Sequence, residues 1–266
     1  METHGDKLTQ DPKITAQLLA ALAALEPLRA RIQAAIVPPP VPGSPAAIAA
    51  GTSLGELAFI FAGTNMAVAA DHLEAWAGLM RNGIQPAYSH ITLLRGALEG
   101  SVAARWLLDP RIDTAERLRR GIVIQLADYI ERRKFEELAG ATDEEGVGRA
   151  RSAAYRIGEL REGAKNAGVT DLVMPSTTWL FERYGASGYR DGRPWYGLVS
   201  AYAHGKQWAL LTAKRTELVG TEQNPVGPRR GQVTANDQLS LDMTRLTLVY
   251  VKAALNDLER YVGRVA

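Results

Sequence analysis

The stretch PAYSHITLLRGALEGSVAARWLL, residues 86–108, decides the fold class. At 100° per residue, its apolar side chains cover most of the circumference of a helix. A helix that is apolar nearly all round is usually buried at the centre of a protein. The stretch therefore predicts a central helix that other helices surround. Its apolar positions are Ile91, Leu93, Leu94, Ala97, Leu98, Val102, Ala104, Leu107 and Leu108.

Apolar residues recur at three- and four-residue steps on both sides of this stretch, and Pro- or Gly-containing turns separate the segments. Ser53, with Glu56 three residues later, is predicted to open the second helix as a capping box. Long helices with short connections are typical of a bundle, so we predict an all-α fold of seven or eight helices. The predicted helices are 11–36, 53–81, 86–108, 114–138, 142–166, 176–184, 194–214 and 236–262.

Two segments fall outside this pattern. Five prolines between Pro38 and Pro45 predict an extended linker. The chain is therefore divided into an N-terminal helix with its linker, 1–45, and a helical-bundle domain, 46–266, although we expect the first helix to pack back onto one continuous domain. Residues 216–234 contain Asn-Pro and Gly-Pro turns and predict a long loop or a small β-hairpin before the last helix.

The composition excludes several classes of protein. The 266 residues include no cysteine, which excludes disulfides, thiolate metal sites and a cysteine nucleophile. The formal net charge is only +2, so any RNA contact must come from a local patch rather than from a generally basic surface. The basic ends of helix 114–138 and the loop 228–230 are the candidates for such a patch.

The sequence also bears on location. Residues 46–70 carry a single charge, Glu56, over a length that would span a bilayer. Its Thr, Asn and Gly residues, and the absence of flanking Lys or Arg, favour a buried helix instead. The start of the chain lacks the basic and apolar regions of a signal peptide. We therefore expect a cytoplasmic protein with no membrane partner.

The central helix carries a pair of opposite charges. Arg95 and Glu99 are four residues apart and therefore adjacent on a narrow stripe that also holds Tyr88. One interpretation is an internal salt bridge that fixes helix register, since burying either charge alone is costly. The other is a polar pocket in which Arg95 binds an anion and Glu99 orients it or acts as a base.

A second polar cluster occurs on helix 194–214. Tyr196, Ser200 and His204 fall within one arc of this helix. The spacing of Ser200 and His204 suits a nucleophile and its base, but it also suits an ordinary hydrogen bond, and no nucleophile elbow surrounds Ser200. Gly205, directly after His204, predicts close approach of another backbone or of a ligand.

Metal and cofactor motifs are absent from the sequence. The four histidines are scattered, and neither a His-Glu-x-x-His nor a Glu-x-x-His signature occurs. No Walker or dinucleotide-binding glycine motif is present either. We therefore expect no metal and no cofactor.

The segments Tyr88–Glu99 and Trp195–Gly205 resemble the HEPN-like group of uncharacterised bacterial helical proteins. In that group an Arg-x-x-x-Glu helix is followed much later by a Tyr-x-x-x-Ser-x-x-x-His helix. The resemblance implies a helical bundle, and many relatives are RNases or toxin-like defence proteins that act as dimers. The HEPN nuclease motif also places an arginine shortly before the histidine, whereas here the nearest upstream arginine is Arg193.

These observations lead to three hypotheses of function. The first is a HEPN-like protein that binds or cleaves a phosphate-bearing ligand such as RNA in an internal polar pocket, with the homodimer that the resemblance implies. The second is a non-enzymatic interaction or ligand-binding module, and the third is a small-molecule enzyme with Glu99 or His204 as general base. The candidate catalytic residues are Arg95, Glu99, Ser200 and His204, and the candidate ligand-binding residues are Tyr88, Arg117, Asp128 and Tyr196.

Overall fold

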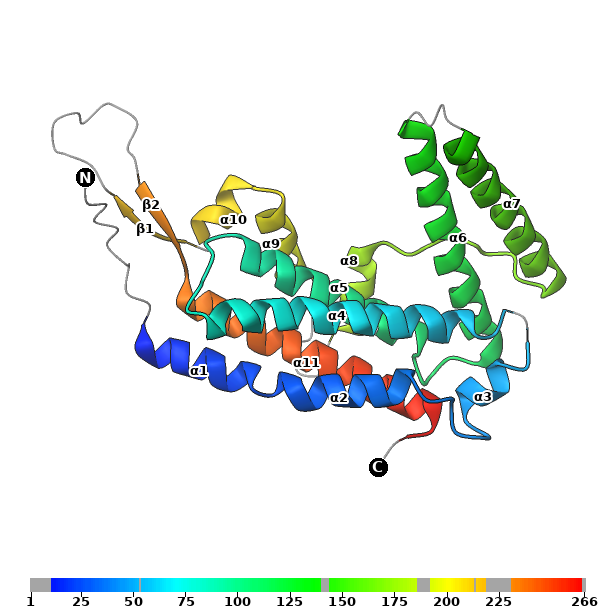
Figure 1. The fold of residues 1–266 in the computed structure, drawn as a ribbon, viewed down its shortest axis with the longest axis horizontal. Helices are drawn as coiled ribbons and strands as arrows, with labels where there is room; N and C mark the ends of the chain where they lie inside the picture. Colours follow the sequence, from blue (N-terminus) through cyan, green and yellow to red (C-terminus); the bar gives the residue numbers. More distant parts are fainter. Residues whose placement is uncertain are drawn as a thin grey trace.

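The computed structural model describes residues 11–264 except 53, 140–143, 186–191, 213 and 219–230. The all-α class is confirmed, because helices supply nearly all of the core of the described residues (Figure 1). The helices are α1 (Pro12–Leu22), α2 (Leu25–Ile36), α3 (Pro45–Ala49), α4 (Leu57–Arg81), α5 (Ser89–Leu107), α6 (Thr114–Leu138), α7 (Glu144–Asn166), α8 (Thr177–Tyr184), α9 (Arg193–Ala203), α10 (Gln207–Thr212) and α11 (Asp237–Val262).

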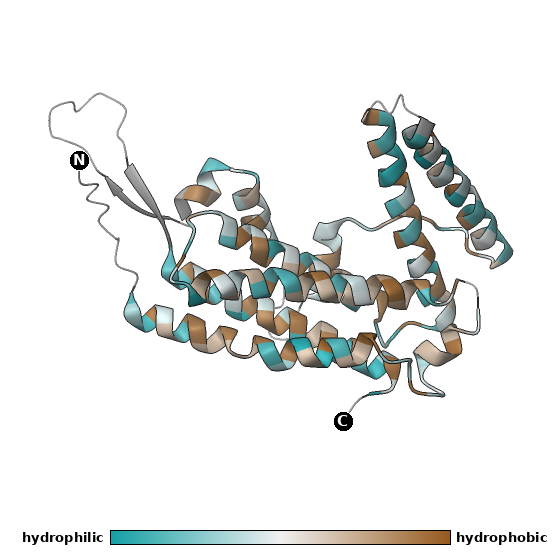
Figure 2. Cartoon of the chain, viewed as in Figure 1, coloured by the Kyte–Doolittle hydropathy of each residue, from teal (hydrophilic) through white to brown (hydrophobic). Residues whose placement is uncertain are grey.

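The helix α5 lies at the centre of the bundle, as its apolar circumference predicts. It packs against α4 and α11 along its length and against α8 and α9 on another side. The helices α1 and α2 follow one another along the outside of α4 and α11, so the N-terminal segment belongs to the same core (Figure 1). Figure 2 shows apolar stretches (brown) alternating with hydrophilic ones (teal) along these helices.

Small residues allow the helices to approach closely. A Cβ atom added to Gly100 of α5 would lie 2.6 Å from the carbonyl oxygen of Asn65 on α4. Likewise, a Cβ on Gly121 of α6 would lie 2.8 Å from the backbone nitrogen of Ala58. Because these separations leave no room for a side chain, the two glycines set the distances of α5 and α6 from α4.

The single helix predicted over 11–36 is wrong, because the chain breaks between α1 and α2. Asp11 caps α1 as expected, and its Oδ1 accepts from the backbone N–H of Lys13 at 2.8 Å. Pro27 lies in the first turn of α2. In an uninterrupted helix its ring would clash with the carbonyl of Ala23, four residues earlier, and no N–H would reach that carbonyl. The break at residues 23–24 follows from this one proline.

Three further predicted boundaries are corrected. Two of these, the extra helix α3 and the division of 194–214, together with the break before Pro27, make the count of seven or eight helices too low. The linker 38–45 leads into the extra short helix α3, which Ser44 caps. The second long helix begins at Leu57, four residues later than predicted, and its proposed cap Ser53 lies outside the described residues. The predicted helix 194–214 is divided into α9 and α10 at Gly205, where φ is +66°.

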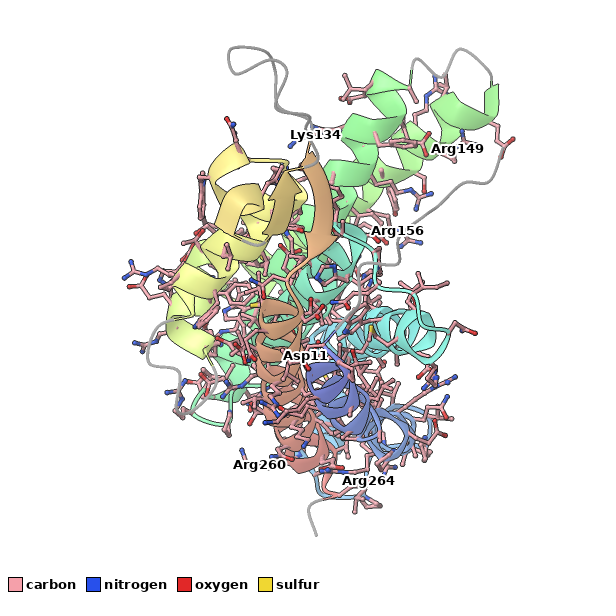
Figure 3. The ribbon with its side chains drawn as sticks, turned by 90° about the vertical axis from the view of Figure 1, so that its left-hand side faces the viewer. Asp11, Lys134, Arg149, Arg156, Arg260 and Arg264 are labelled. Carbon is pink, nitrogen blue, oxygen red and sulfur yellow. The ribbon has the colours of Figure 1, made fainter. Side chains whose placement is uncertain are left out.

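The helices α6 and α7 form an antiparallel arm that projects from one end of the bundle (Figure 1). The base of α6 packs on α4, and farther out the arm has its own small core, centred on Leu126, Ile157 and Leu160. Arg149 and Arg156 lie on this arm, whereas Arg260 and Arg264 lie at the opposite end of the view in Figure 3. The arm therefore carries much of the basic surface of helix 114–138 away from the centre of the bundle.

Two short strands lie between α10 and α11. Residues Lys214–Leu218 (β1) pair antiparallel with Gly231–Ala235 (β2), with Lys214 opposite Ala235 and Leu218 opposite Gly231. Among the described helices, α4 included, none combines the length and the apolar character that crossing a bilayer requires.

Candidate functional site

Four of the predicted site residues meet where α5 and α9 lie side by side. The guanidinium of Arg95 donates from Nε to Oε1 of Glu99 at 2.8 Å. Its Nη1 lies 3.3 Å from Nε2 of His204, a residue 109 positions later in the chain. The guanidinium carbon also lies 5.9 Å from the centre of the Tyr196 ring. Arg95 is therefore the centre of the cluster, and we call these four residues the Arg95 cluster.

The hydrogen-bonding chemistry of arginine fixes the tautomer of His204. A guanidinium carries only donors, so Nε2 of His204 must be the acceptor and the ring proton lies on Nδ1. The imidazole is thus neutral in this arrangement, and its lone pair is directed at a cation. In this contact the lone pair of Nε2 is occupied by the guanidinium donor, and it becomes available only when Nη1 of Arg95 finds another acceptor.

The Arg95 cluster lies at the surface rather than in an internal pocket. The side chain of Arg95 is 21% exposed and that of Glu99 is 34% exposed, and His204 is exposed at the end of α9. Burial alone would lower the pKa of Arg95, but the hydrogen bond and charge of Glu99, with a smaller contribution from Tyr196, raise it. Arg95 is therefore a permanent cation that a ligand can reach.

Ser200 does not form the predicted pair with His204. Its backbone carbonyl accepts the N–H of His204 at 3.0 Å, but within the described residues no hydrogen bond joins its hydroxyl to the imidazole. His204 is the C-cap of α9, with φ −90° and ψ 10°, so its side chain leaves the helical arc and reaches Arg95 instead. Gly205 supplies the left-handed turn that ends α9, and the open space around it corrects the expectation of a close approach.

The remaining ligand-binding candidates lie in other places. Tyr88 flanks the Arg95 cluster as the residue before α5, where it is exposed and its ring centre lies 6.1 Å from that of Tyr202. Asp128 is exposed on the arm. Arg117 lies at the base of α6, where its guanidinium covers the ring of Tyr261 at 4.9 Å. A single pocket that joins Arg117 and Asp128 to Arg95 was predicted and is not formed, because α6 begins at the far end of α5 and leads away from the bundle.

The basic residues of helix 114–138 are largely neutralised. Arg119 and Arg120 both donate to Glu116, at 2.7 and 2.6 Å, and Lys134 donates to Glu131 at 2.7 Å. These pairs hold the pKa of Glu116 down to about 2, with the hydrogen bond from Arg119 as the largest cause. The loop 228–230 lies outside the described residues. The arm is therefore a weaker candidate for an RNA contact than its composition indicates.

Two buried polar networks join α5 to its neighbours and were not predicted. Arg105 donates to Asp257 of α11 at 3.1 Å and to the carbonyl of Tyr184 at 2.8 Å. Arg120 donates to the hydroxyl of Tyr184 at 2.8 Å and also to the carbonyl of Trp106. Arg105 was the available signal, since it stands in the apolar helix 86–108 and needs a buried partner.

The second network surrounds His90, which is 1% exposed. Its Nδ1 lies 2.7 Å from the carbonyl of Pro86 and must donate, so its Nε2 accepts from the hydroxyl of Ser240 at 2.9 Å. The neighbouring Trp76 donates to Thr244 at 2.9 Å. Desolvation lowers the pKa of His90 to about 4, so this imidazole is neutral and structural.

Among the described residues, no group of three or more His, Asp or Glu side chains is arranged to hold a metal ion. Comparison with family models, with curated proteins and with solved structures finds no match for this chain. The function must therefore be argued from the Arg95 cluster itself.

Proposed function

We propose that this protein binds a phosphate-bearing ligand such as RNA at the Arg95 cluster. The observation that supports the proposal is the contact of Arg95 with His204, two accessible groups that come from helices far apart in the sequence. A cation beside a neutral imidazole is a suitable pair for a phosphodiester, since one binds the anion and the other can take up a proton.

The guanidinium has donors to spare for a ligand. It carries five N–H groups, of which Glu99, His204 and Tyr196 engage one each. Phosphate oxygens are strong acceptors and would bind the remaining donors. The ring of Tyr196 stacks on Phe181 with the ring centres 4.5 Å apart and also lies beside the guanidinium, so it helps to hold Arg95 in place for a ligand.

The same geometry supports a role for His204 in cleavage. A phosphate that accepts from Nη1 of Arg95 would displace the contact with His204 and free the lone pair of Nε2 for a ribose bound beside it. The imidazole would take the proton of the 2′-hydroxyl, and the 2′-oxygen would attack phosphorus while the 5′-oxygen leaves with a proton from water.

Glu99 opposes the binding of an anion, because its negative charge offsets the positive charge of Arg95. This balance favours a ligand with several phosphates over a ligand with a single one.

The HEPN-like resemblance supports the proposal from a second direction. The Arg-x-x-x-Glu and Tyr-x-x-x-Ser-x-x-x-His segments that carry it contribute all four residues of the Arg95 cluster. In this interpretation the protein is a HEPN-like bundle, and the homodimer that the resemblance implies would place two such clusters in one assembly.

The test is RNA binding and cleavage by the purified full-length chain. A fluorescein-labelled single-stranded RNA reports binding through anisotropy and cleavage on a denaturing gel. We expect His204→Ala to change the Kd by less than about threefold and to abolish cleavage, because the imidazole is the base and not the anion-binding group. Binding without cleavage by the wild-type protein would identify a non-enzymatic module. A wild-type protein that neither binds nor cleaves RNA would contradict the proposal.

A further inference from the structure

A second site lies at the other end of the bundle, where α3, α6 and α7 meet. A cavity of about 730 Å³ opens there, and Ala49, Leu54, Leu118 and Ala167 are among the residues that line it. Figure 1 shows α3 beside the base of the arm, where this cavity lies. Its volume is within the range of small-molecule sites, and its walls are mostly apolar.

Arg117 is the one charged residue among those that line this cavity. Its two hydrogen bonds both use Nη2, which donates to the carbonyls of Asp109 and Ile112 at 2.9 and 3.4 Å. Its Nε is buried and makes no hydrogen bond, and in the part of the chain that the structure describes no carboxylate forms an ion pair with this guanidinium. Desolvation lowers the pKa of Arg117, which reflects the cost of this burial.

Tyr261 provides the second unsatisfied group. It lines the same cavity and is only 3% exposed, yet its hydroxyl has no hydrogen-bond partner among the described residues. Buried polar groups are nearly always hydrogen-bonded, so two unsatisfied ones on side chains whose guanidinium carbon and ring centre are 4.9 Å apart require an explanation. Both atoms are closed off from solvent in this structure, so a ligand with acceptor oxygens would satisfy them through a shift of the two side chains toward the cavity that they line.

We propose that this cavity binds an amphipathic monocarboxylate, of the medium-chain fatty acid type, with its carboxylate on Arg117 and Tyr261 and its chain along the apolar wall. A single arginine matches a single negative charge, and a carboxylate accepts several hydrogen bonds at once. The negative charges of Asp109 and Asp113 lie close enough to Arg117 to raise its pKa. They would also repel a bound anion, and they would repel a dianion such as a phosphate monoester more strongly than a monocarboxylate. This site is separate from the Arg95 cluster and does not depend on the proposed RNA binding.

The test is isothermal titration calorimetry of the full chain with dodecanoate below its micellar concentration. Dodecan-1-ol and dodecylammonium serve as ligands of equal chain length without the negative charge. We expect dodecanoate to bind at one site, and Arg117→Met to weaken it about tenfold or more, because a charge-assisted hydrogen bond is lost while the apolar stem remains. The matched control Arg132→Met removes the same charge from an exposed position on α6 and should leave the Kd unchanged.

A second variant keeps the proposal testable if Arg117→Met fails to fold. Ala115 is exposed and lines the cavity, so Ala115→Trp should fill the cavity and abolish binding without disturbing the core. Arg95→Ala should bind dodecanoate like the wild type. Equal affinity for dodecylammonium, or unchanged binding in folded Arg117→Met or Ala115→Trp, would overturn the proposal.

Discussion

Nε2 of His204 accepts a hydrogen bond from Nη1 of Arg95 at 3.3 Å, across 109 residues of sequence. The contact joins the surface of the central helix α5 to the last turn of α9. It is made by two side chains that a ligand can reach, which distinguishes it from the buried networks around His90 and Arg120.

Removal of Arg95 should change the stability of the fold only slightly. The side chains of Arg95 and Glu99 are 21% and 34% exposed, so Glu99 remains hydrated when its partner is lost. We expect Arg95→Ala to lower the free energy of unfolding by about 1 kcal/mol or less, as for exposed ion pairs. Urea unfolding measures the change. A loss of about 3–5 kcal/mol would instead indicate a purely structural, buried pair.

Removal of the charge of Glu99 should strengthen anion binding. Glu99→Gln keeps an oxygen that accepts from Nε of Arg95 but removes the negative charge beside it. We expect the Kd for single-stranded RNA to fall about three- to tenfold at low salt, with a smaller gain at high salt because screening weakens the repulsion. Weaker RNA binding by Glu99→Gln would show that Glu99 contacts the ligand as a required acceptor.

Stability should fall in mild acid because of His90. Desolvation lowers the pKa of His90 to about 4 in the folded state, below the 6.5 of an ordinary imidazole. The unfolded chain therefore binds a proton between these values that the folded chain does not, so stability is full above pH 6.5 and falls as the pH drops toward 4. We expect a loss of about 2 kcal/mol from His90 between pH 7 and pH 5.

Urea unfolding across this pH range measures the loss, and His90→Gln provides the comparison because its amide does not titrate. The slope in the variant should be shallower than in the wild type. A wild-type His90 that titrates near 6.5 in the NMR spectrum of the folded protein would contradict the assignment.

Arg120 should contribute far more to stability than Arg95. It is 7% exposed and donates to Glu116, to the hydroxyl of Tyr184 and to the carbonyl of Trp106. We expect Arg120→Ala to lower the free energy of unfolding by about 2–4 kcal/mol, because the buried acceptors lose their donor. Arg132→Ala, at an exposed position on the same helix, should change it by about 0.5 kcal/mol or less. Equal effects of the two variants would rule out a structural role for Arg120.

The central position of α5 could be predicted from its sequence, because a helix that is apolar all round has only one stable place in a bundle. The pairing of Arg95 with Glu99 was also predictable, since it depends on spacing within one helix. The contact with His204 was not, because it depends on how α9 ends and on which helix α9 packs against.

Other features depend on local steric effects or tertiary contacts that the hydrophobic periodicity of the sequence does not reveal. The break before Pro27 is a local steric effect, and its signal was present in the sequence. The separation of Arg117 and Asp128 from the Arg95 cluster arises because α6 leaves the bundle as part of the arm. That direction is set by the close approach of Gly121 to α4, a tertiary contact between residues more than sixty positions apart.

The most direct test of the account is the Kd of single-stranded RNA for Arg95→Ala, compared with Arg132→Ala at the same salt concentration. Both variants lose one positive charge, but only Arg95 belongs to the proposed site. We predict that Arg95→Ala weakens binding about tenfold or more, while Arg132→Ala stays within about twofold of the wild type. Equal losses in the two folded variants would contradict binding at the Arg95 cluster.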